Sequence, residues 1–126
     1  MIHPTTPSTL FVASNFGVFR SVDAGISYTK VVNAVATGLV IDPSNANIMY
    51  AAGGDPFGSP SNGVYKSTDG GVTWGGLGGG ASGLPPNNIG RVALAIAPSS
   101  PSTLYAAMQD ATTSGLLGIY KTTNGG

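Results

Sequence analysis

The chain has 126 residues, of which 41% are hydrophobic and 8% are charged, and its five basic and five acidic residues give a formal net charge of zero. Ordinary soluble domains carry about 25% charged residues. This chain lacks the basic stripe that binds phosphate backbones, so we expect no nucleic-acid partner. It has no cysteine, which excludes disulfides and thiolate zinc sites.

The N-terminal segment MIHPTTPSTL has neither the basic region nor the apolar region of a signal peptide. No apolar run approaches the roughly 20 residues that a membrane-spanning helix requires, so we expect no membrane span. The 20 glycines and 9 prolines predict many turns and little helix.

Two sequence blocks occur three times along the chain. The first block reads HPTTPSTLFVAS from His3, DPSNANIMYAAG from Asp42 and APSSPSTLYAAM from Ala97. The second block follows it and reads GVFRSVDAGISY from Gly17, GVYKSTDGGVTW from Gly63 and GIYKTTNGG from Gly118. The similar segments ATGLVI and RVALAI directly precede the second and third copies of the first block. Repeats of roughly 40 to 50 residues with several short strands each are typical of β-propeller blades.

We therefore predict an all-β fold of about two and a half to three four-stranded antiparallel β-propeller blades in an incomplete ring. Blade one covers 3–33 without a convincing first strand, blade two covers 36–77, and blade three covers 91–126 without its last strand. In blade two the strands are expected at 36–41, 47–52, 63–67 and 73–77. An incomplete ring exposes apolar faces. As partners we therefore expect the remaining blades of a longer parent chain, or other copies of this chain.

The second block carries the pattern SxDxGx[ST][WY], which resembles the Asp-box of the bacterial neuraminidase repeat and sortilin-like β-propellers. The two full copies consist of Ser21, Asp23, Gly25, Ser27 and Tyr28, and of Ser67, Asp69, Gly71, Thr73 and Trp74. The third copy has Thr122 and Asn124 and stops before its aromatic position. Tyr28 and Asn124 depart from the usual Trp and Asp. The resemblance covers nearly the whole chain.

An aspartate in such a hairpin turn can accept hydrogen bonds from backbone N–H groups in an Asx-type turn, and Gly25 and Gly71 permit positive φ there. The resemblance implies that the Ser and Thr hydroxyls complete the network and that Trp74 packs over the turn. We expect Asp23 and Asp69 to be buried and structural.

In an antiparallel four-stranded blade, the Asp-box turns lie at the opposite end from the second-to-third-strand loops. Those loops are long at 53–62 and 109–115, and the crossing GGLGGGASGLPPNN from Gly75 opens on the same end. Loops on a rigid scaffold commonly carry function. The candidate binding residues at this end are Asp55, Phe57, Asn62, Asn87, Asn88 and Asp110. Asp55 and Asp110 are also weak catalytic candidates, although loop acids that close local Asx turns explain both at least as well.

Other motifs predict no chemistry. GGLGGG resembles a phosphate-binding loop, but Pro85 and Pro86 follow where a helix would be needed. His3, the one histidine, occupies a turn position of the repeat and has no partner ligand, so we expect no metal and no cofactor. Arg20, Lys66 and Lys121 share one repeat position, which favours a blade-surface role over a binding triad.

Our favoured hypothesis for function is a non-catalytic propeller scaffold or binding segment of a bacterial extracellular or cell-envelope protein, with a glycan or protein ligand. The alternative is part of a glycoside hydrolase, xyloglucanase-like more than sialidase-like. Resemblance to sialidases implies an arginine cluster and a Tyr/Glu pair, and this chain has no glutamate. A second alternative is a structural protein that self-assembles through open blade edges.

Overall fold

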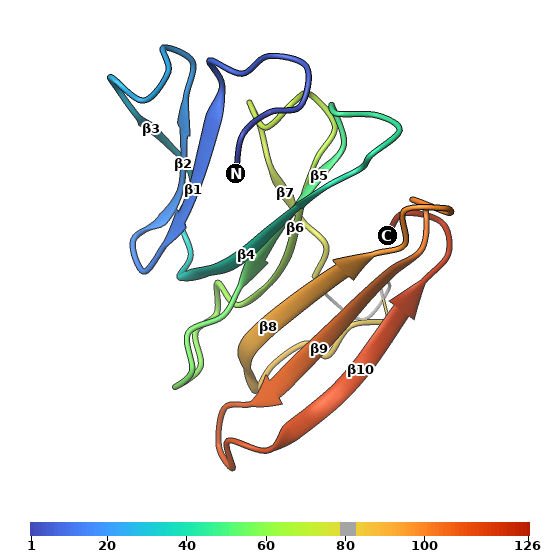
Figure 1. Ribbon diagram of the computed structural model, residues 1–126. Helices are drawn as coiled ribbons and strands as arrows, with labels where there is room; N and C mark the ends of the chain where they lie inside the picture. The colour runs from blue at the N-terminus through green and yellow to red at the C-terminus, as the bar shows by residue number, and fades with distance from the viewer. Residues whose placement is uncertain (79–82) are drawn as a thin grey trace.

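The computed structural model of the protein describes residues 1–78 and 83–126. The glycine-rich crossing that begins at Gly75, with its GGLGGG motif, therefore lies partly outside the described residues. Ten strands form three antiparallel sheets (Figure 1), and the described residues contain no helix. Since no helix occurs there, none is long and apolar enough to cross a membrane.

Each sheet is a meander in which consecutive strands pair. Sheet one contains β1 (Leu10–Ser14), β2 (Gly17–Ser21) and β3 (Thr29–Val32). Sheet two contains β4 (Ala36–Ile41), β5 (Met49–Gly53), β6 (Gly63–Ser67) and β7 (Gly75–Gly76). Sheet three contains β8 (Ile89–Ile96), β9 (Leu104–Asp110) and β10 (Leu116–Thr122). The predicted all-β blade fold is confirmed, with one sheet of four strands between two sheets of three.

Two strands of the middle sheet are shorter than predicted. β5 begins at Met49 because Asn47 belongs to the preceding turn, where its amide donates to Asn45 Oδ1 (3.1 Å). β7 is reduced to Gly75–Gly76 because Thr73 still belongs to the Asp69 turn, where its amide donates to the carboxylate. In both places a side-chain acceptor competes with the strand ladder for the backbone amide.

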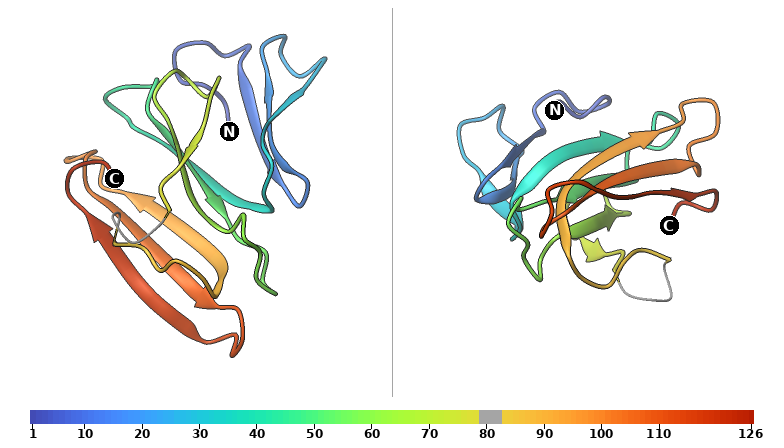
Figure 2. Two further views of the ribbon diagram at one scale, coloured as in Figure 1. Left: turned by 180° about the vertical axis from the view of Figure 1, so that it is seen from behind. Right: turned by 90° about the horizontal axis from the view of Figure 1, so that it is seen from below.

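The sheets stack face to face, and the middle sheet is covered on both sides (Figure 2). Alternate residues of β5 point to opposite faces. Met49 and Ala51 pack toward sheet one, whereas Tyr50 and Ala52 pack toward sheet three. The first core contains Phe11, Val18, Val32, Ala34, Ala36, Met49 and Ala51. The second contains Tyr50, Ala52, Val64, Ile89, Val92, Leu104, Ala106 and Met108.

The turns that follow β2, β6 and β10 lie at one end of the sheets. Each turn is hydrogen-bonded to the segment just before the preceding strand of its own sheet. The amide of Gly70 donates to the carbonyl of Asn47 (3.0 Å). In the same way, the amide of Ala24 donates to the carbonyl of Ser8 (2.9 Å), and the amide of Gly125 donates to the carbonyl of Ser102 (2.8 Å). The 53–62 loop and the β9–β10 loop lie at the other end, at the bottom of Figure 1. We call these two ends the turn end and the loop end.

Candidate functional site

The turn around Asp23 is held by hydrogen bonds to the carboxylate. Its Oδ1 accepts from the Ser21 hydroxyl (2.7 Å) and from the Ser27 amide (2.9 Å). Its Oδ2 accepts from the Ser27 hydroxyl (2.6 Å). The Ser21 hydroxyl oxygen in turn accepts from the Gly25 amide (2.9 Å). Side chains and backbone thus form one closed network around the turn.

The turn around Asp69 repeats this network. Oδ1 accepts from the Ser67 hydroxyl (2.8 Å) and from the amides of Val72 (3.0 Å) and Thr73 (2.9 Å). Oδ2 accepts from the Thr73 hydroxyl (2.5 Å). Trp74 closes over the turn and donates its indole N–H to the Gly71 carbonyl (3.1 Å).

The expectation that these carboxylates are buried is wrong. Asp69 is exposed and Asp23 is half-exposed, whereas Ser21 and Ser67 are the buried members of the two turns. The donors come from the turn's own backbone at the surface, so the carboxylate can be saturated without leaving water. These hydrogen bonds, above all those from the side chain and backbone of Ser27 and of Thr73, hold the pKa of both carboxyls far below the usual range.

The third turn uses an amide in place of the carboxylate. Asn124 Oδ1 accepts from the Thr122 hydroxyl (2.6 Å) and from the Gly126 amide (3.2 Å). The Gly126 amide also donates to the Thr122 hydroxyl oxygen (3.2 Å). An uncharged acceptor therefore supports the same turn.

The two acids at the loop end also accept bonds from their own loops. Asp55 Oδ1 accepts from the Phe57 amide (2.9 Å). Asp110 Oδ1 accepts from the amides of Thr112 and Thr113 (both 2.8 Å), and its Oδ2 accepts from the Asn88 amide group (2.8 Å). These bonds, led by that of Thr113, lower the pKa of the Asp110 carboxyl. Both acids have the geometry of Asx turns.

Asn62 and Asn88 fix the loops to the sheets. The Asn62 amide group donates to the carbonyls of Asp55 (2.8 Å) and Ile89 (2.6 Å), and its Oδ1 accepts from the Asp55 amide (2.8 Å). Asn88 Oδ1 accepts from the Thr112 hydroxyl (2.8 Å). The loop end is therefore cross-linked between sheets two and three.

A hollow of about 500 Å³ lies between these loops. Of the predicted binding residues, Phe57, Asn62, Asn87 and Asn88 line it, whereas Asp55 and Asp110 do not. Phe57 is 90% exposed, and Asn87 is exposed beside it. Thr112 also lines the hollow, and sequence reasoning missed it because its position depends on the Asn88 bond. The hollow offers an aromatic face, amides and hydroxyls.

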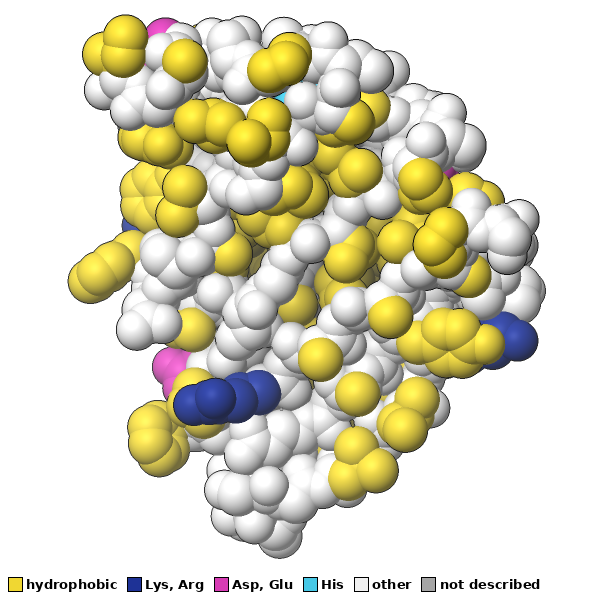
Figure 3. Space-filling view, in the orientation of Figure 1, with side chains coloured by type: hydrophobic (Ala, Val, Ile, Leu, Met, Phe, Trp, Pro, Cys, Tyr) yellow, Lys and Arg dark blue, Asp and Glu magenta, His cyan; other side chains and the backbone are white. Residues whose placement is uncertain are grey.

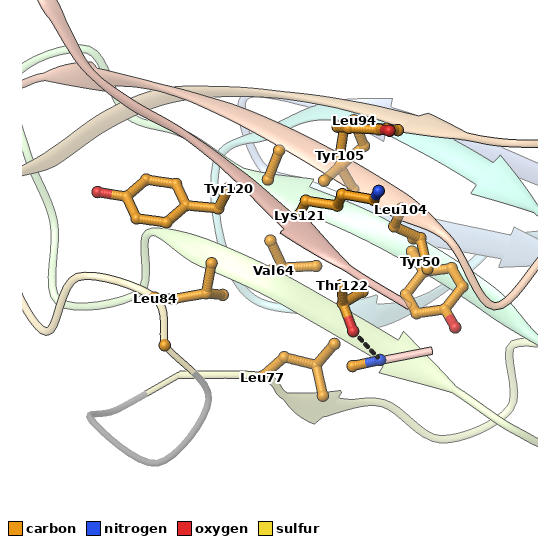
Figure 4. A pocket seen from close by; sticks show the side chains of 13 residues that line it. Tyr50, Val64, Leu77, Leu84, Leu94, Leu104, Tyr105, Tyr120, Lys121 and Thr122 are labelled. Atoms are coloured by element: carbon orange, nitrogen blue, oxygen red, sulfur yellow. Dashed lines mark hydrogen bonds between the residues drawn. The ribbon is translucent and has the colours of Figure 1, made fainter. Parts of the chain in front are cut away.

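A second, smaller cavity of about 120 Å³ separates sheets two and three. Figure 4 shows Leu77, Leu84 and Val64 on one side of it and Tyr120 on the other. Its lining is mostly apolar, and the drawn hydrogen bond joins Thr122 to the Gly126 amide. This cavity is a packing gap between blades. Within 1–78 and 83–126, no three His, Cys, Asp or Glu side chains group as metal ligands.

Comparison with known proteins relates the chain to xyloglucanases. No protein-family model matches it. It is 38% identical over 77 residues to a xyloglucanase from Hypocrea jecorina (strain QM6a), across 57% of this chain and 9% of that protein. An ancestral GH74 enzyme superposes over 100% of this chain and 17% of its own, with a TM-score of 0.75 and 24% identity. A Niastella koreensis GH74 enzyme superposes over 99% of this chain and 21% of its own, with a TM-score of 0.61 and 24% identity.

These comparisons establish the fold. The chain spans only a small part of each relative's length. Across that part, its three sheets match blades of a β-propeller.

Proposed function

We propose that the chain forms part of a glycoside hydrolase propeller of the xyloglucanase kind and that its loop end binds the polysaccharide substrate. The observation that carries this proposal is the 38% identity over 77 residues to a xyloglucanase. The identity supports the alternative of the sequence analysis, part of a glycoside hydrolase propeller, better than the favoured hypothesis of a non-catalytic scaffold or binding segment of a bacterial extracellular or cell-envelope protein. Because a polysaccharide does not cross a membrane, this function also implies an extracellular parent protein.

The hollow at the loop end suits a sugar chain. A sugar ring has an apolar face, which can stack on an exposed aromatic side chain, and a rim of hydroxyls, which amides and hydroxyls can bind. Phe57 supplies the aromatic face, and Asn87 and Thr112 supply polar groups beside it. The bonds of Asn62 hold this loop to β8, so little order remains to be gained on binding.

We further propose that this segment binds the substrate and does not supply the pair of catalytic acids. Glycoside hydrolysis needs two carboxyl groups that flank the scissile bond, one of them protonated. Asp110 accepts three hydrogen bonds within its loop region, and its lowered pKa opposes a role as general acid. Asp55 Oδ1 is bonded to the Phe57 amide, and neither acid lines the hollow.

Titration of the chain with xyloglucan oligosaccharides in a calorimeter tests the binding proposal. We expect binding, and a loss of about fivefold in affinity for Phe57→Ala, since stacking contributes about 1 kcal/mol. Phe16→Ala is the matched control, because Phe16 is an exposed phenylalanine outside the hollow. Absence of binding, or equal loss in both variants, contradicts the proposal.

A reducing-sugar assay on xyloglucan tests the catalytic assignment separately. If the chain hydrolyses the polymer and Asp55→Asn or Asp110→Asn abolishes turnover, the acids of this segment are catalytic and our assignment is wrong. Absence of turnover agrees with it. Turnover that is indifferent to both changes would also contradict it, because the catalytic acids would then lie elsewhere in this segment.

A further inference from the structure

One wall of the hollow at the loop end rests on a chain of hydrogen bonds that begins at a carboxylate. The Asn88 Nδ2 group donates to Asp110 Oδ2 (2.8 Å), and the Thr112 hydroxyl donates to Asn88 Oδ1 (2.8 Å). Asn88 and Thr112 line the hollow, whereas Asp110 does not. The chain therefore connects a charge outside the hollow to a hydroxyl at its wall.

Backbone bonds hold the members of this chain in place. Asp110 Oδ1 accepts from the amides of Thr112 and Thr113 (both 2.8 Å), and the Ala111 amide donates to the Asn88 carbonyl (3.1 Å). Asn88 has a positive φ of 59°, a conformation that a residue other than glycine keeps only where its surroundings fix it. The Asn88 side chain is therefore fixed between Asp110 and Thr112.

The charge on Asp110 decides which way round the Asn88 carboxamide lies. Hydrogen bonds, led by that from the Thr113 amide, lower the pKa of Asp110, and an ionised carboxylate has acceptors only. It pairs with the Asn88 Nδ2 group and would repel Oδ1 at the same distance. Asn88 Oδ1 therefore faces Thr112, whose hydroxyl must donate its single proton to it. The lone pairs that remain on the Thr112 oxygen can only accept.

Asn62, which lines the hollow from the 53–62 loop, also has its amide group occupied. Its Nδ2 group donates to the carbonyls of Asp55 (2.8 Å) and Ile89 (2.6 Å), so both of its N–H bonds are used. On the face drawn in Figure 3, the tip of the β9–β10 loop at the bottom shows mostly uncharged polar groups and backbone. Recognition beside Thr112 therefore depends on the direction of hydrogen bonds.

We propose that Asp110 is a positioning residue that makes Thr112 a hydrogen-bond acceptor toward the ligand, so that this wall selects a ligand hydroxyl that donates. The inference rests on the proposed function, and it gives Asp110 a role that needs no contact with the sugar. A site built to bind a hydroxyl discriminates against an analogue that lacks it, because its own polar group is then left unpaired. A ligand atom that can only accept should therefore bind poorly beside Thr112.

The substitution Asp110→Asn should reverse the chain. The new carboxamide keeps an oxygen toward the amides of Thr112 and Thr113 and presents an N–H group to Asn88. Asn88 must then turn its own oxygen to meet that group, so its Nδ2 group donates to the Thr112 oxygen. The Thr112 proton becomes free to donate into the hollow.

Calorimetry with xyloglucan oligosaccharides in which fluorine replaces one hydroxyl at a time tests the proposal, because fluorine cannot donate. One position should weaken binding to the wild type about two- to tenfold, which is the effect of one hydrogen bond. Thr112→Val should abolish this penalty, Thr112→Ser should restore it, and Asp110→Asn should reduce it to about twofold or less. Thr113→Val is the matched control and should keep the penalty, because Thr113 does not line the hollow.

The outcomes separate this inference from the proposed function. If binding depends on Phe57 but no fluorine penalty responds to Thr112→Val, or if Asp110→Asn leaves the penalty unchanged, this inference is wrong and the proposed function stands. If the wild-type chain binds no oligosaccharide, the proposed function is wrong and this inference fails with it.

NMR on the ligand-free wild-type chain tests the hydrogen-bond chain without any variant. The Asn88 Nδ2 resonances should shift with acid at the same midpoint as the Asp110 carboxyl carbon. Asp55, the other acid of the loop end, accepts from the Phe57 amide, so its midpoint should not govern the Asn88 signals. An Asn88 side chain that does not respond to the titration of Asp110 overturns the proposal.

Discussion

At the scale of single residues, the carboxylates of Asp23 and Asp69 act as hydrogen-bond acceptors for their own turns. Asn124 shows which part of that role needs no charge, since its one oxygen accepts from both Thr122 and Gly126. The second carboxylate oxygen adds the bond from the hydroxyl of Ser27 or Thr73. Bonds to an ionised acceptor are stronger than those between neutral groups. The aspartate turns should therefore be the more stable ones.

This role makes stability depend on pH. The pKa of Asp23 and of Asp69 is lower in the folded protein than the value of about 3.9 expected after unfolding. Each carboxylate therefore stabilises the fold above about pH 4, and the contribution is lost as the pH falls toward the folded-state pKa. In thermal unfolding, the double variant Asp23→Asn, Asp69→Asn should melt below the wild type at neutral pH, and the gap should narrow below about pH 4.

A gap that stays constant down to about pH 3 would show that the charge contributes nothing to the turns. Asp110→Asn is a useful comparison, because the pKa of Asp110 is also lowered but the residue lies at the loop end. The difference in melting temperature between Asp110→Asn and the wild type should also narrow below about pH 4, although this substitution leaves the turn end unchanged.

At the scale of elements, the turn of one sheet and the aromatic residue of the sheet before it act together. Gly71 has φ +78° and lies against the Phe11 ring, so it is restricted both by its backbone and by its neighbour. Gly83 has a similar φ of +72°, but a Cβ there would meet nothing within 4 Å. Alanine substitutions at Gly71 and Gly83 therefore distinguish the destabilisation caused by positive φ from that caused by the clash with a neighbouring side chain.

Gly83→Ala should lower the free energy of unfolding by about 1 kcal/mol, which is the cost of positive φ alone. Gly71→Ala should lower it by about 3 kcal/mol or more, because the methyl group also displaces the Phe11 ring from between two sheets. Urea unfolding of both variants measures this difference. Equal losses would mean that the turn is not packed against sheet one.

The sequence predicted the elements better than it predicted the contacts between them. β4 and β6 follow the predicted ranges, because their patterns are local. The repeated aromatic position was visible, but its partner was not, since Tyr50 and the Gly125 carbonyl are 75 residues apart. The candidate binding loops lie together at one end as topology required. Which of their side chains line the hollow depends on the bonds of Asn62 and Asn88, which no local pattern encodes.

At the scale of the whole molecule, the two ends of the stacked sheets have different tasks. At the turn end, the carboxylates of Asp23 and Asp69 are saturated by their own backbone, and the turns of sheets two and three lock adjacent sheets together. At the loop end, longer loops are cross-linked but leave Phe57 open beside a hollow. We therefore propose that stability is concentrated at the first end and substrate binding at the second.

Chemical-shift mapping by NMR with a xyloglucan oligosaccharide tests this division most directly. We expect the perturbed amides to cluster around Phe57, Asn87 and Thr112, and the amides of Ser27 and Thr73 to stay unchanged at saturation. Perturbation centred on the Asp23 and Asp69 turns, with the loop end unchanged, would contradict the account.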